Sequence, residues 1–278
     1  MSWKAGDGLR SAPTLEDRDG GARTRWRRSH IEADLAHASR PLVHLLPELA
    51  LGVTSALAYF AVRGLMSNSA ADAVDHARAL VRLEKACGFY WESAWQDIVA
   101  QHHVLVTFVN WIYIYAHWPV ILAVAIWLMR FRHTTYIVFR NAFLISGFVG
   151  LCVFVLYPVA PPRLAGLQLV DTITQYSNSY RVLQPPGFVN QYAAFPSLHF
   201  GWNLLAGIAL YRTVPNRAIH VVALTIPALM FFAIVATANH FIIDAVAGGM
   251  LSLLALVVAA RIAPRDAVEG EAQDALVS

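Results

Sequence analysis

Six long apolar stretches constrain the fold of this chain more than any other feature of its sequence. Each is close to the length of about 20 residues that an α-helix needs to cross the hydrocarbon core of a bilayer. They are Leu42–Val62, Val104–Met129, Tyr136–Tyr157, Ala193–Tyr211, Ile219–Ala238 and Phe241–Ala260. Only 14% of all residues are charged, against about 25% in a soluble domain. The sequence therefore predicts an all-α, polytopic membrane bundle with six transmembrane helices, and it argues against a water-soluble protein.

The segments outside these stretches divide the chain into a membrane domain and two tails. Residues 1–41 are polar and carry charges of both signs, which is typical of a disordered basic tail. Residues 42–265 form the predicted six-span domain, and residues 266–278 form a second disordered tail. The net charge of +3 comes from arginines scattered among apolar blocks, which provide no basic face for a nucleic acid. We therefore expect a membrane protein with no nucleic acid partner.

The distribution of Lys and Arg predicts the orientation of the bundle. With six spans, both termini lie on one side. That side carries fourteen of the Lys and Arg residues, and the opposite side carries six. Positive residues are retained in the cytoplasm, so both termini are predicted to be cytoplasmic, in a multi-pass protein of the plasma membrane. The two long connections, residues 63–103 and 158–192, then face the extracytoplasmic side.

The two long connections differ in character. Ala70–Val99 has a helical pattern, with Leu80, Leu83, Ala86 and Cys87 spaced as one face, and with Trp and Tyr residues near its end. Such a helix fits a position in the membrane interface, and packing onto the outer end of the bundle fits equally well. The second connection contains five prolines, which favours a fixed, extended course.

Ionisable residues inside spans are costly and tend to mark function. In the predicted topology, His199, His240 and Asp244 all fall at extracytoplasmic helix ends, near the 158–192 connection. His240 and Asp244 are four residues apart, so both face the same side of a helix. A carboxylate that accepts the imidazole N–H leaves the other ring nitrogen as a nucleophile or base. A purely structural hydrogen bond between two buried polar groups is an equally good interpretation of the spacing alone.

Two further residues have the chemistry to bind an anion near this pair. Ser197 stands where a helix begins, and a helix N-terminus offers unpaired N–H groups and a positive dipole. Arg163 follows two prolines and carries a fork of donors that suits a phosphate. Taken alone, the tetrapeptide Pro196–His199 is better interpreted as a helix cap at Ser197 and an interfacial histidine at His199. Arg163 alone fits a loop arginine that contacts lipid headgroups.

Three motifs carry a resemblance to a known family. They are Tyr157–Arg163 (YPVAPPR), Phe195–His199 (FPSLH), and Asn239–Asp244 (NHFIID) followed by Gly248 and Gly249. In order and spacing they resemble the motifs of the type 2 phosphatidic acid phosphatase superfamily, and they look closest to its inositol phosphorylceramide synthase-like (inositolphosphotransferase) branch. The resemblance covers about residues 104–260. It implies a phosphatase or phosphotransferase that acts on a lipid phosphate through a phosphohistidine.

The resemblance implies a role for each matching residue. His240 becomes the nucleophile, Asp244 orients it, and His199 protonates the leaving oxygen, while Ser197 and Arg163 hold the phosphate. Two phosphate-binding cations of the general family pattern are missing, because Leu156 and Ile234 occupy their positions. Leu198 replaces the usual glycine of the second motif, and this change indicates the synthase-like branch.

Four other residues are weaker candidates for substrate contacts. Arg181 offers a second cation from the 158–192 connection. His117 lies mid-span in a Tyr- and His-rich sequence, where a histidine with satisfied hydrogen bonds is the better interpretation. Asp171 and Asn190 have the chemistry to bind an acceptor hydroxyl or a headgroup, although most such residues form turns.

Two other function classes use the same His, His and Asp residues. A zinc-dependent membrane hydrolase would ligate the metal through them, but the chain lacks a tight spacing such as His-Glu-x-x-His. A transporter would place its ionisable groups at mid-membrane, between repeated broken helices, and here they gather at one face. We therefore expect an enzyme without a metal or other cofactor, which transfers the phosphoryl group to water, a polyol or a lipid hydroxyl.

Overall fold

The computed structural model describes residues 70–176 and 191–263, together with residues 46, 48, 50–55 and 57. The chain divides into two compact units, Met1–Ala56 and Leu57–Ser278. The described positions of the first unit are all helical. The two predicted tails, most of the predicted span Leu42–Val62 and residues 177–190 lie outside the described residues.

The second unit is helical throughout residues 70–176 and 191–263, apart from its connections. Its elements are α3 (Ala70–Cys87), α4 (Glu92–Ala100), α5 (His103–Trp111), η2 (Ile112–Ala116), α6 (His117–Phe131), α7 (His133–Leu156), η3 (Pro162–Leu164), α8 (Thr172–Tyr176), α10 (Leu198–Thr213), α11 (Arg217–Ala236) and α12 (Ile242–Ile262). An isolated β-bridge joins Val159 and Ala193, and no β-strand occurs in these two ranges. The all-α class is confirmed for this part of the chain.

Four helical stretches among the described residues are long and apolar enough to cross a membrane. They are His103–Phe131, His133–Leu156, Arg217–Ala236 and Ile242–Ile262, and they coincide with four of the six predicted spans. The first of them combines α5, η2 and α6, where η2 is a short π-helical segment. The protein is thus a helical membrane protein, while the count of six spans and the side of the termini stay predictions.

α10 is shorter than its predicted span Ala193–Tyr211. It begins at Leu198, because the side-chain oxygen of Ser197 caps the helix by accepting from the N–H of Phe200. It ends at Thr213, where Pro215 follows. α11 then starts at once, because Asn216 Oδ1 accepts from the N–H groups of Ala218 (2.8 Å) and Ile219 (3.3 Å). Caps of this kind stabilise a helix by about 1 kcal/mol.

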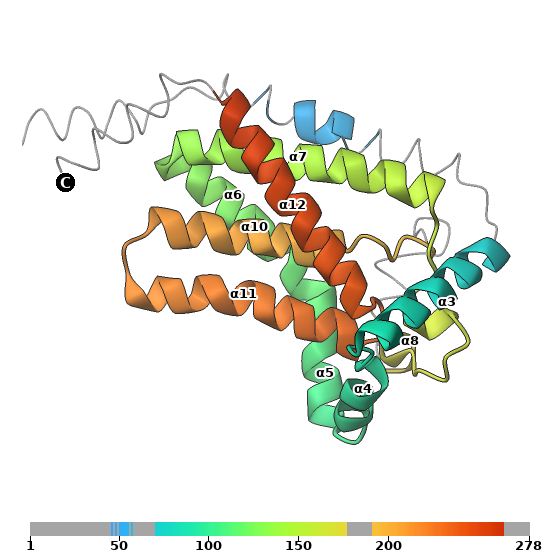
Figure 1. Ribbon diagram of the computed structural model, residues 1–278. Helices are drawn as coiled ribbons and strands as arrows, with labels where there is room; N and C mark the ends of the chain where they lie inside the picture. Colours follow the sequence, from blue (N-terminus) through green and yellow to red (C-terminus); the bar gives the residue numbers. More distant parts are fainter. Residues whose placement is uncertain are drawn as a thin grey trace, which may run out of the picture. The chain divides into compact units, whose positions relative to one another are not determined.

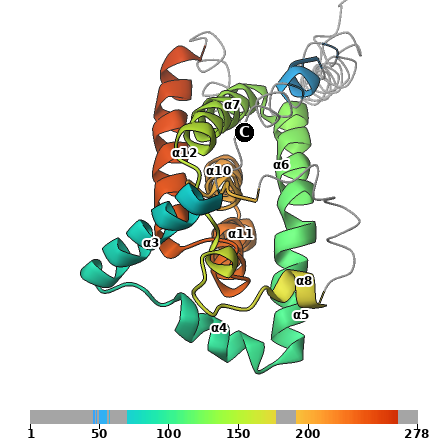
Figure 2. The same cartoon turned by 90° about the vertical axis from the view of Figure 1, so that its right-hand side faces the viewer.

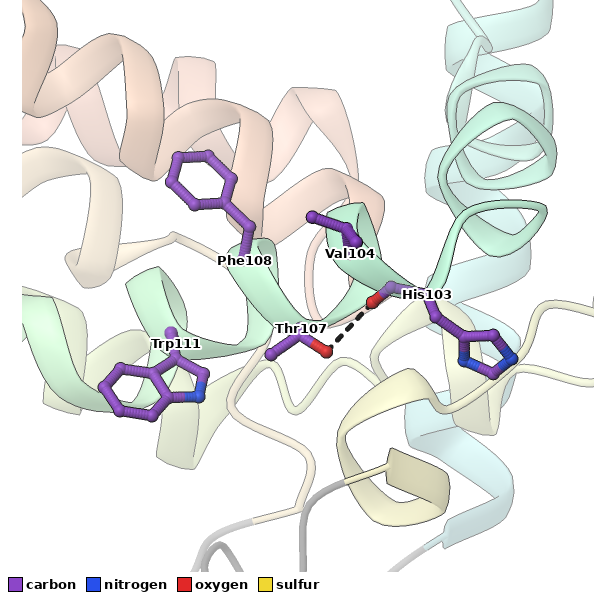
Figure 3. A pocket seen from close by; sticks show the side chains of 5 residues that line it. All are labelled: His103, Val104, Thr107, Phe108 and Trp111. Carbon is purple, nitrogen blue, oxygen red and sulfur yellow. Dashed lines mark hydrogen bonds between the residues drawn. The ribbon is translucent and has the colours of Figure 1, made fainter.

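The outer faces of these helices are strongly apolar, as lipid-facing surfaces should be. Val104 is 81% exposed, Trp111 63% and Leu156 81%. Figure 3 shows a shallow pocket on the outer face of α5, where a hydrogen bond joins Thr107 Oγ1 to the carbonyl oxygen of His103 (2.9 Å). Its lining residues are His103, Val104, Thr107, Phe108 and Trp111. None of them is a predicted site residue.

α10 is the central helix of the bundle. It packs against α6, α7, α11 and α12, and Figure 2 shows it in their midst. A Cβ atom on Gly201 of α10 would meet Ser252 and the backbone of Gly248 on α12, so the glycines let these two helices approach closely. This close approach brings the first turns of α10 and α12 together at one end of the bundle.

α3 and α4 pack against that same end of the bundle, where α12 begins (Figure 1). Gly88 separates the two helices, and its φ of +79° is a conformation that glycine adopts without strain. The buried face of α3 consists of Ala73, Ala77, Leu80, Val81 and Glu84. Of the four residues predicted to share a face, Leu80 is buried, whereas Leu83, Ala86 and Cys87 are exposed. The helix therefore packs one face against the protein and exposes Leu83, Ala86 and Cys87 on another. Its position in the membrane interface stays a prediction.

Candidate active site

His240 lies in the short connection between α11 and α12, and only 5% of its surface is exposed. Its backbone N–H donates to the carbonyl oxygen of Ile234 (3.1 Å). Its ring atom Nδ1 lies 2.7 Å from the carbonyl oxygen of Ala194. A carbonyl oxygen only accepts hydrogen bonds, so Nδ1 carries the proton and Nε2 keeps the lone pair. This geometry prepares Nε2 for the role of a nucleophile.

Asp244 is brought beside His240, but it does not make the short hydrogen bond that the spacing suggested. Its Oδ2 atom lies 3.5 Å from His240 Nδ1, longer than the 2.7–2.9 Å of a charge-assisted hydrogen bond. The same oxygen accepts from the backbone N–H of Phe241 (2.9 Å). The ring is therefore oriented mainly by Ala194, with the Asp244 carboxyl beside it.

His199 lies in the first turn of α10, and its ring centre is 5.8 Å from that of His240. On its other sides it contacts His117 (4.3 Å between ring centres) and stacks on Tyr113 (4.8 Å). The side-chain amide of Asn203 donates to the carbonyl oxygen of His199 (2.8 Å) and contacts His117 Nδ1 (2.9 Å). The two histidines from the second and third motifs thus face one another across the site.

The start of α10 offers an anion-binding terminus directly beside these rings. Ser197 is fully buried and its side chain caps the helix. Its backbone N–H donates to the carbonyl oxygen of Asp244 (2.9 Å), which ties the first turns of α10 and α12 together. The backbone N–H groups of Leu198 and His199 have no hydrogen-bond partner among the described residues. Free N–H groups at a helix N-terminus favour a bound anion.

Arg163 joins the first motif to the third. It lies in η3 with its side chain 13% exposed, and its Nη1 atom is 3.7 Å from Asp171 Oδ2. Its Nε donates to the side-chain oxygen of Asn239 (3.0 Å), and its backbone N–H donates to the carbonyl oxygen of Ala238 (3.1 Å). The guanidinium is therefore held next to His240, and Nη2 has no partner in the described part of the chain.

Burial is the dominant influence on the charge of His240. Together with a smaller contribution from the positive charge of Arg163, it lowers the pKa of the imidazole from 6.5 to about 4, although the hydrogen bond to Ala194 acts in the opposite direction. The ring is therefore neutral at pH 7, the form that a nucleophile needs.

The weaker candidates have clear structural partners where they are described. Asp171 caps α8 by accepting from the N–H (2.9 Å) and the hydroxyl (2.7 Å) of Thr174, and it also pairs with Arg163. His117 is buried against Asn203 and His199. Arg181 and Asn190 lie outside the described residues. Ile234, at the position of a missing cation, is buried in an apolar cluster with Val109 and Tyr113.

Sequence analysis missed three residues that the structure places around the site. Asn239 belongs to the third motif, but its bond to Arg163 spans 76 residues of sequence. Glu84 and Glu92 are fully buried and accept from the backbone N–H groups of Ile243 (2.8 Å) and Ile242 (2.9 Å). Nothing in the sequence of this helical segment distinguishes them from exposed charges.

The arrangement as a whole defines a class of protein: a helical membrane protein with two histidines and an arginine gathered at the joined ends of two helices. Within residues 70–176 and 191–263, no group of three or more His, Cys, Asp or Glu side chains is placed to hold a metal ion.

Comparisons with known proteins identify the family. Residues 78–258 match the family model described as the PAP2 superfamily, and the chain belongs to this superfamily. With its apolar helices, this membership places the protein among membrane phosphatases of the PAP2 kind. A comparison with curated proteins finds no significant match. Among solved structures, the chain is similar to the crystal structure of Aquifex aeolicus LpxE, with a TM-score of 0.45 and 15% identity over 61% of this chain and 93% of that chain.

Proposed function

We propose that the protein is an integral-membrane enzyme that removes or transfers the phosphoryl group of a lipid phosphate through a phosphohistidine at His240. The observation that carries this proposal is the short contact between His240 Nδ1 and the carbonyl oxygen of Ala194 (2.7 Å). It leaves a neutral Nε2 with a lone pair, next to a second histidine and an arginine. A nucleophile held in one tautomer by a fixed acceptor is the pattern that covalent catalysis by histidine requires.

The reaction proceeds in two steps. In the first step Nε2 of His240 attacks phosphorus, a nitrogen–phosphorus bond forms, and the bond from phosphorus to the lipid oxygen breaks. His199 donates its proton to that oxygen, so the lipid leaves as an alcohol. In the second step water or another hydroxyl attacks phosphorus and gives its proton to His199. The nitrogen–phosphorus bond then breaks, which restores His240.

The remaining site residues stabilise the charges that develop during the reaction. Arg163 and the free N–H groups at the start of α10 bind the phosphate oxygens, and Ser197 shapes this terminus. Asp244, 3.5 Å from Nδ1, offsets the positive charge that the His240 ring gains when Nε2 bonds to phosphorus. Donors placed in advance where charge develops are a major source of rate enhancement.

We further propose that the site faces the extracytoplasmic side of the plasma membrane, and that a polyol or lipid hydroxyl is an acceptor besides water. The orientation follows from the bias of Lys and Arg toward the predicted cytoplasmic side. Transfer to a hydroxyl is what the resemblance to the inositol phosphorylceramide synthase-like branch implies.

The decisive experiment traps the intermediate. Purified protein is incubated with a panel of lipid phosphates, and the products are identified by mass spectrometry with and without candidate alcohols. We expect an acid-labile, base-stable phosphoprotein in the wild type and none in His240→Ala. His220→Ala, which changes a histidine that stacks on Tyr211 (4.2 Å) away from the site, is the matched control. His199→Ala should slow phosphorylation by a lipid phosphate but spare phosphorylation by an ester with a good leaving group.

Two outcomes would overturn the mechanism. One is full activity in His240→Ala, and the other is loss of wild-type activity on chelation that zinc restores. Orientation is tested separately in a background without Cys87 and Cys152. A cysteine at Gln168 should react with a membrane-impermeant thiol reagent on intact cells, and one at Asn216 should not. The reverse pattern would place the site on the cytoplasmic side.

A further inference from the structure

The first turn of α12 is held by carboxylates from outside the motif region. Glu92 Oε1 accepts from the N–H of Ile242 (2.9 Å), and Glu84 Oε1 accepts from the N–H of Ile243 (2.8 Å). With Asp244 on the N–H of Phe241 (2.9 Å), three consecutive N–H groups each have a carboxylate acceptor. The first turn of a helix otherwise leaves these donors without a partner.

Each of the three carboxylates keeps one oxygen without a partner. Glu84 Oε2, Glu92 Oε2 and Asp244 Oδ1 are buried and have no hydrogen-bond partner among the described residues. Three ionised carboxylates without exposed surface are costly, even at the positive end of a helix dipole. A proton on one of them reduces the charge, and it also supplies a donor for a neighbouring oxygen.

Glu84 is a carboxyl of this cluster that favours the protonated form. Burial raises the pKa of its carboxyl from 4.5 to about 9, and the negative charges of Glu92 and Asp244 contribute in the same direction. The backbone bond from Ile243 opposes the shift without reversing it. The other titratable groups nearby are Tyr90, between α3 and α4, and Lys85, whose ammonium lies 4.8 Å from the centre of the Tyr90 ring.

We propose that Glu84 and Glu92 are positioning residues: a buried carboxylate pair that shares one proton, fixes the first turn of α12, and so sets the position of His240 and Asp244. The proposal rests on the proposed function of His240. Ile242 is only two residues from His240, and the carbonyl oxygen of Asp244 binds the backbone of Ser197 at the start of α10 (2.9 Å). A displaced α12 would therefore move both catalytic histidines. A misplacement of about 1 Å costs about 100-fold in rate.

The test compares truncation with neutral replacement. Glu84→Ala and Glu92→Ala should each lower kcat by about 100-fold and change KM much less, because Arg163 and the start of α10 still bind the phosphate. Glu84→Gln should restore most of the activity that Glu84→Ala loses, because an amide imitates the protonated carboxyl. Asp97→Ala, which removes an exposed carboxylate from α4, is the matched control and should be unchanged.

The pH profile provides a readout that a merely structural contact would not move. Glu84 loses its proton as the pH rises through about 9, so wild-type kcat should fall there. Glu84→Gln should remove this alkaline fall. Glu92→Gln should shift it to lower pH, since a neutral neighbour no longer raises the pKa of Glu84. A profile unchanged in both variants, or a Glu84→Gln variant as slow as Glu84→Ala, would overturn the shared proton.

Hydrogen exchange separates failure of this proposal from failure of the proposed function. Amide exchange in the peptide that contains Ile242 and Ile243 should be faster in Glu84→Ala and Glu92→Ala than in the wild type or Asp97→Ala. This measurement does not depend on the substrate or on a phosphohistidine. Unchanged exchange with unchanged kcat in both alanine variants would overturn the positioning role. Faster exchange in the alanine variants, together with a wild type that never forms phosphohistidine, would count against the proposed function alone.

Discussion

Gly248→Ala is predicted to inactivate the protein without touching a catalytic side chain. Gly248 lies on α12, and a Cβ atom there would meet the backbone oxygen, carbon and nitrogen of Ser197. These are backbone atoms of the residue that caps α10, so no side-chain rotation can relieve the overlap. α10 and α12 must separate instead, and the separation falls at the start of α10, next to His199.

The size of the effect follows from this overlap. The helices must separate by more than about 1 Å to restore an ordinary van der Waals contact of about 3.5 Å. Such a shift between His199 and His240 costs about 100-fold in kcat, which corresponds to about 2.7 kcal/mol on the activation barrier. Overpacking of this kind also lowers the free energy of unfolding by about 1–3 kcal/mol.

The neighbouring glycine provides the control. A Cβ on Gly249 would meet Cε1 of Phe200 at 2.9 Å, but this is the far end of a ring that can turn away. Steady-state kinetics on purified protein, normalised to the folded fraction, should show a loss of about 100-fold for Gly248→Ala and a much smaller loss for Gly249→Ala. Equal activity in the two variants would refute the argument that the contact between α10 and α12 sets the site.

Four further predictions follow from the site. Arg163→Lys should lower turnover by about 30- to 1,000-fold, or about 2–4 kcal/mol on the activation barrier. Lysine keeps the positive charge but loses the forked guanidinium that binds both Asn239 and a phosphate. Wild-type kinetics in this variant would mean that Arg163 plays no part in the reaction. Asp244→Asn should lower kcat with the fold retained in circular dichroism, because the positive phosphohistidine ring loses its neighbouring charge. With a substrate whose leaving group needs no proton, activity should stay level from neutral pH down to about 5 and fall only near pH 4. The reason is that the lowered pKa of His240 keeps its ring unprotonated above that pH. A fall in activity centred near pH 6.5 would contradict this. The lowered pKa of His240 also makes the free energy of unfolding decrease as the pH drops from about 6.5 to about 4. Over that range this histidine binds a proton more readily in the unfolded chain than in the folded protein.

Much of the bundle and of the site could be predicted from sequence because both rest on local patterns. Long apolar runs predicted four of the spans directly, since a bilayer demands continuous apolar helices. The three motifs supplied His199, His240, Ser197 and Arg163, and the structure brings them together at one end of the bundle. The first residues of helices were harder to predict from the sequence. α10 begins at Leu198 because Ser197 caps it, although the apolar pattern extends back to Ala193.

The contacts that orient the site could not be predicted, because they join distant residues or involve the backbone. The partner of His240 Nδ1 is the carbonyl oxygen of Ala194, and a carbonyl group carries no side-chain signature. Glu84 and Glu92 reach α12 across 159 and 150 residues of sequence. A glutamate with an exposed carboxylate and one whose buried carboxylate caps another helix give the same helical sequence pattern. Only the packing of α3 and α4 distinguishes the two cases.

The π-helical segment η2 has a consequence for the register of the longest span. A π-helical turn accommodates one more residue than an α-helical turn, and each residue turns an α-helix by about 100°. Beyond η2, the side chains of α6 therefore point about 100° away from where an uninterrupted helix would aim them. His117, the first residue of α6, contacts His199 through this offset. Deleting one residue within Ile112–Ala116 should therefore convert η2 into an α-helical turn and leave both halves of the span facing as they do now, whereas a one-residue deletion in an α-helical part of the span would rotate one half against the other by about 100°. In this span, the number of residues thus matters to the site as much as their identity.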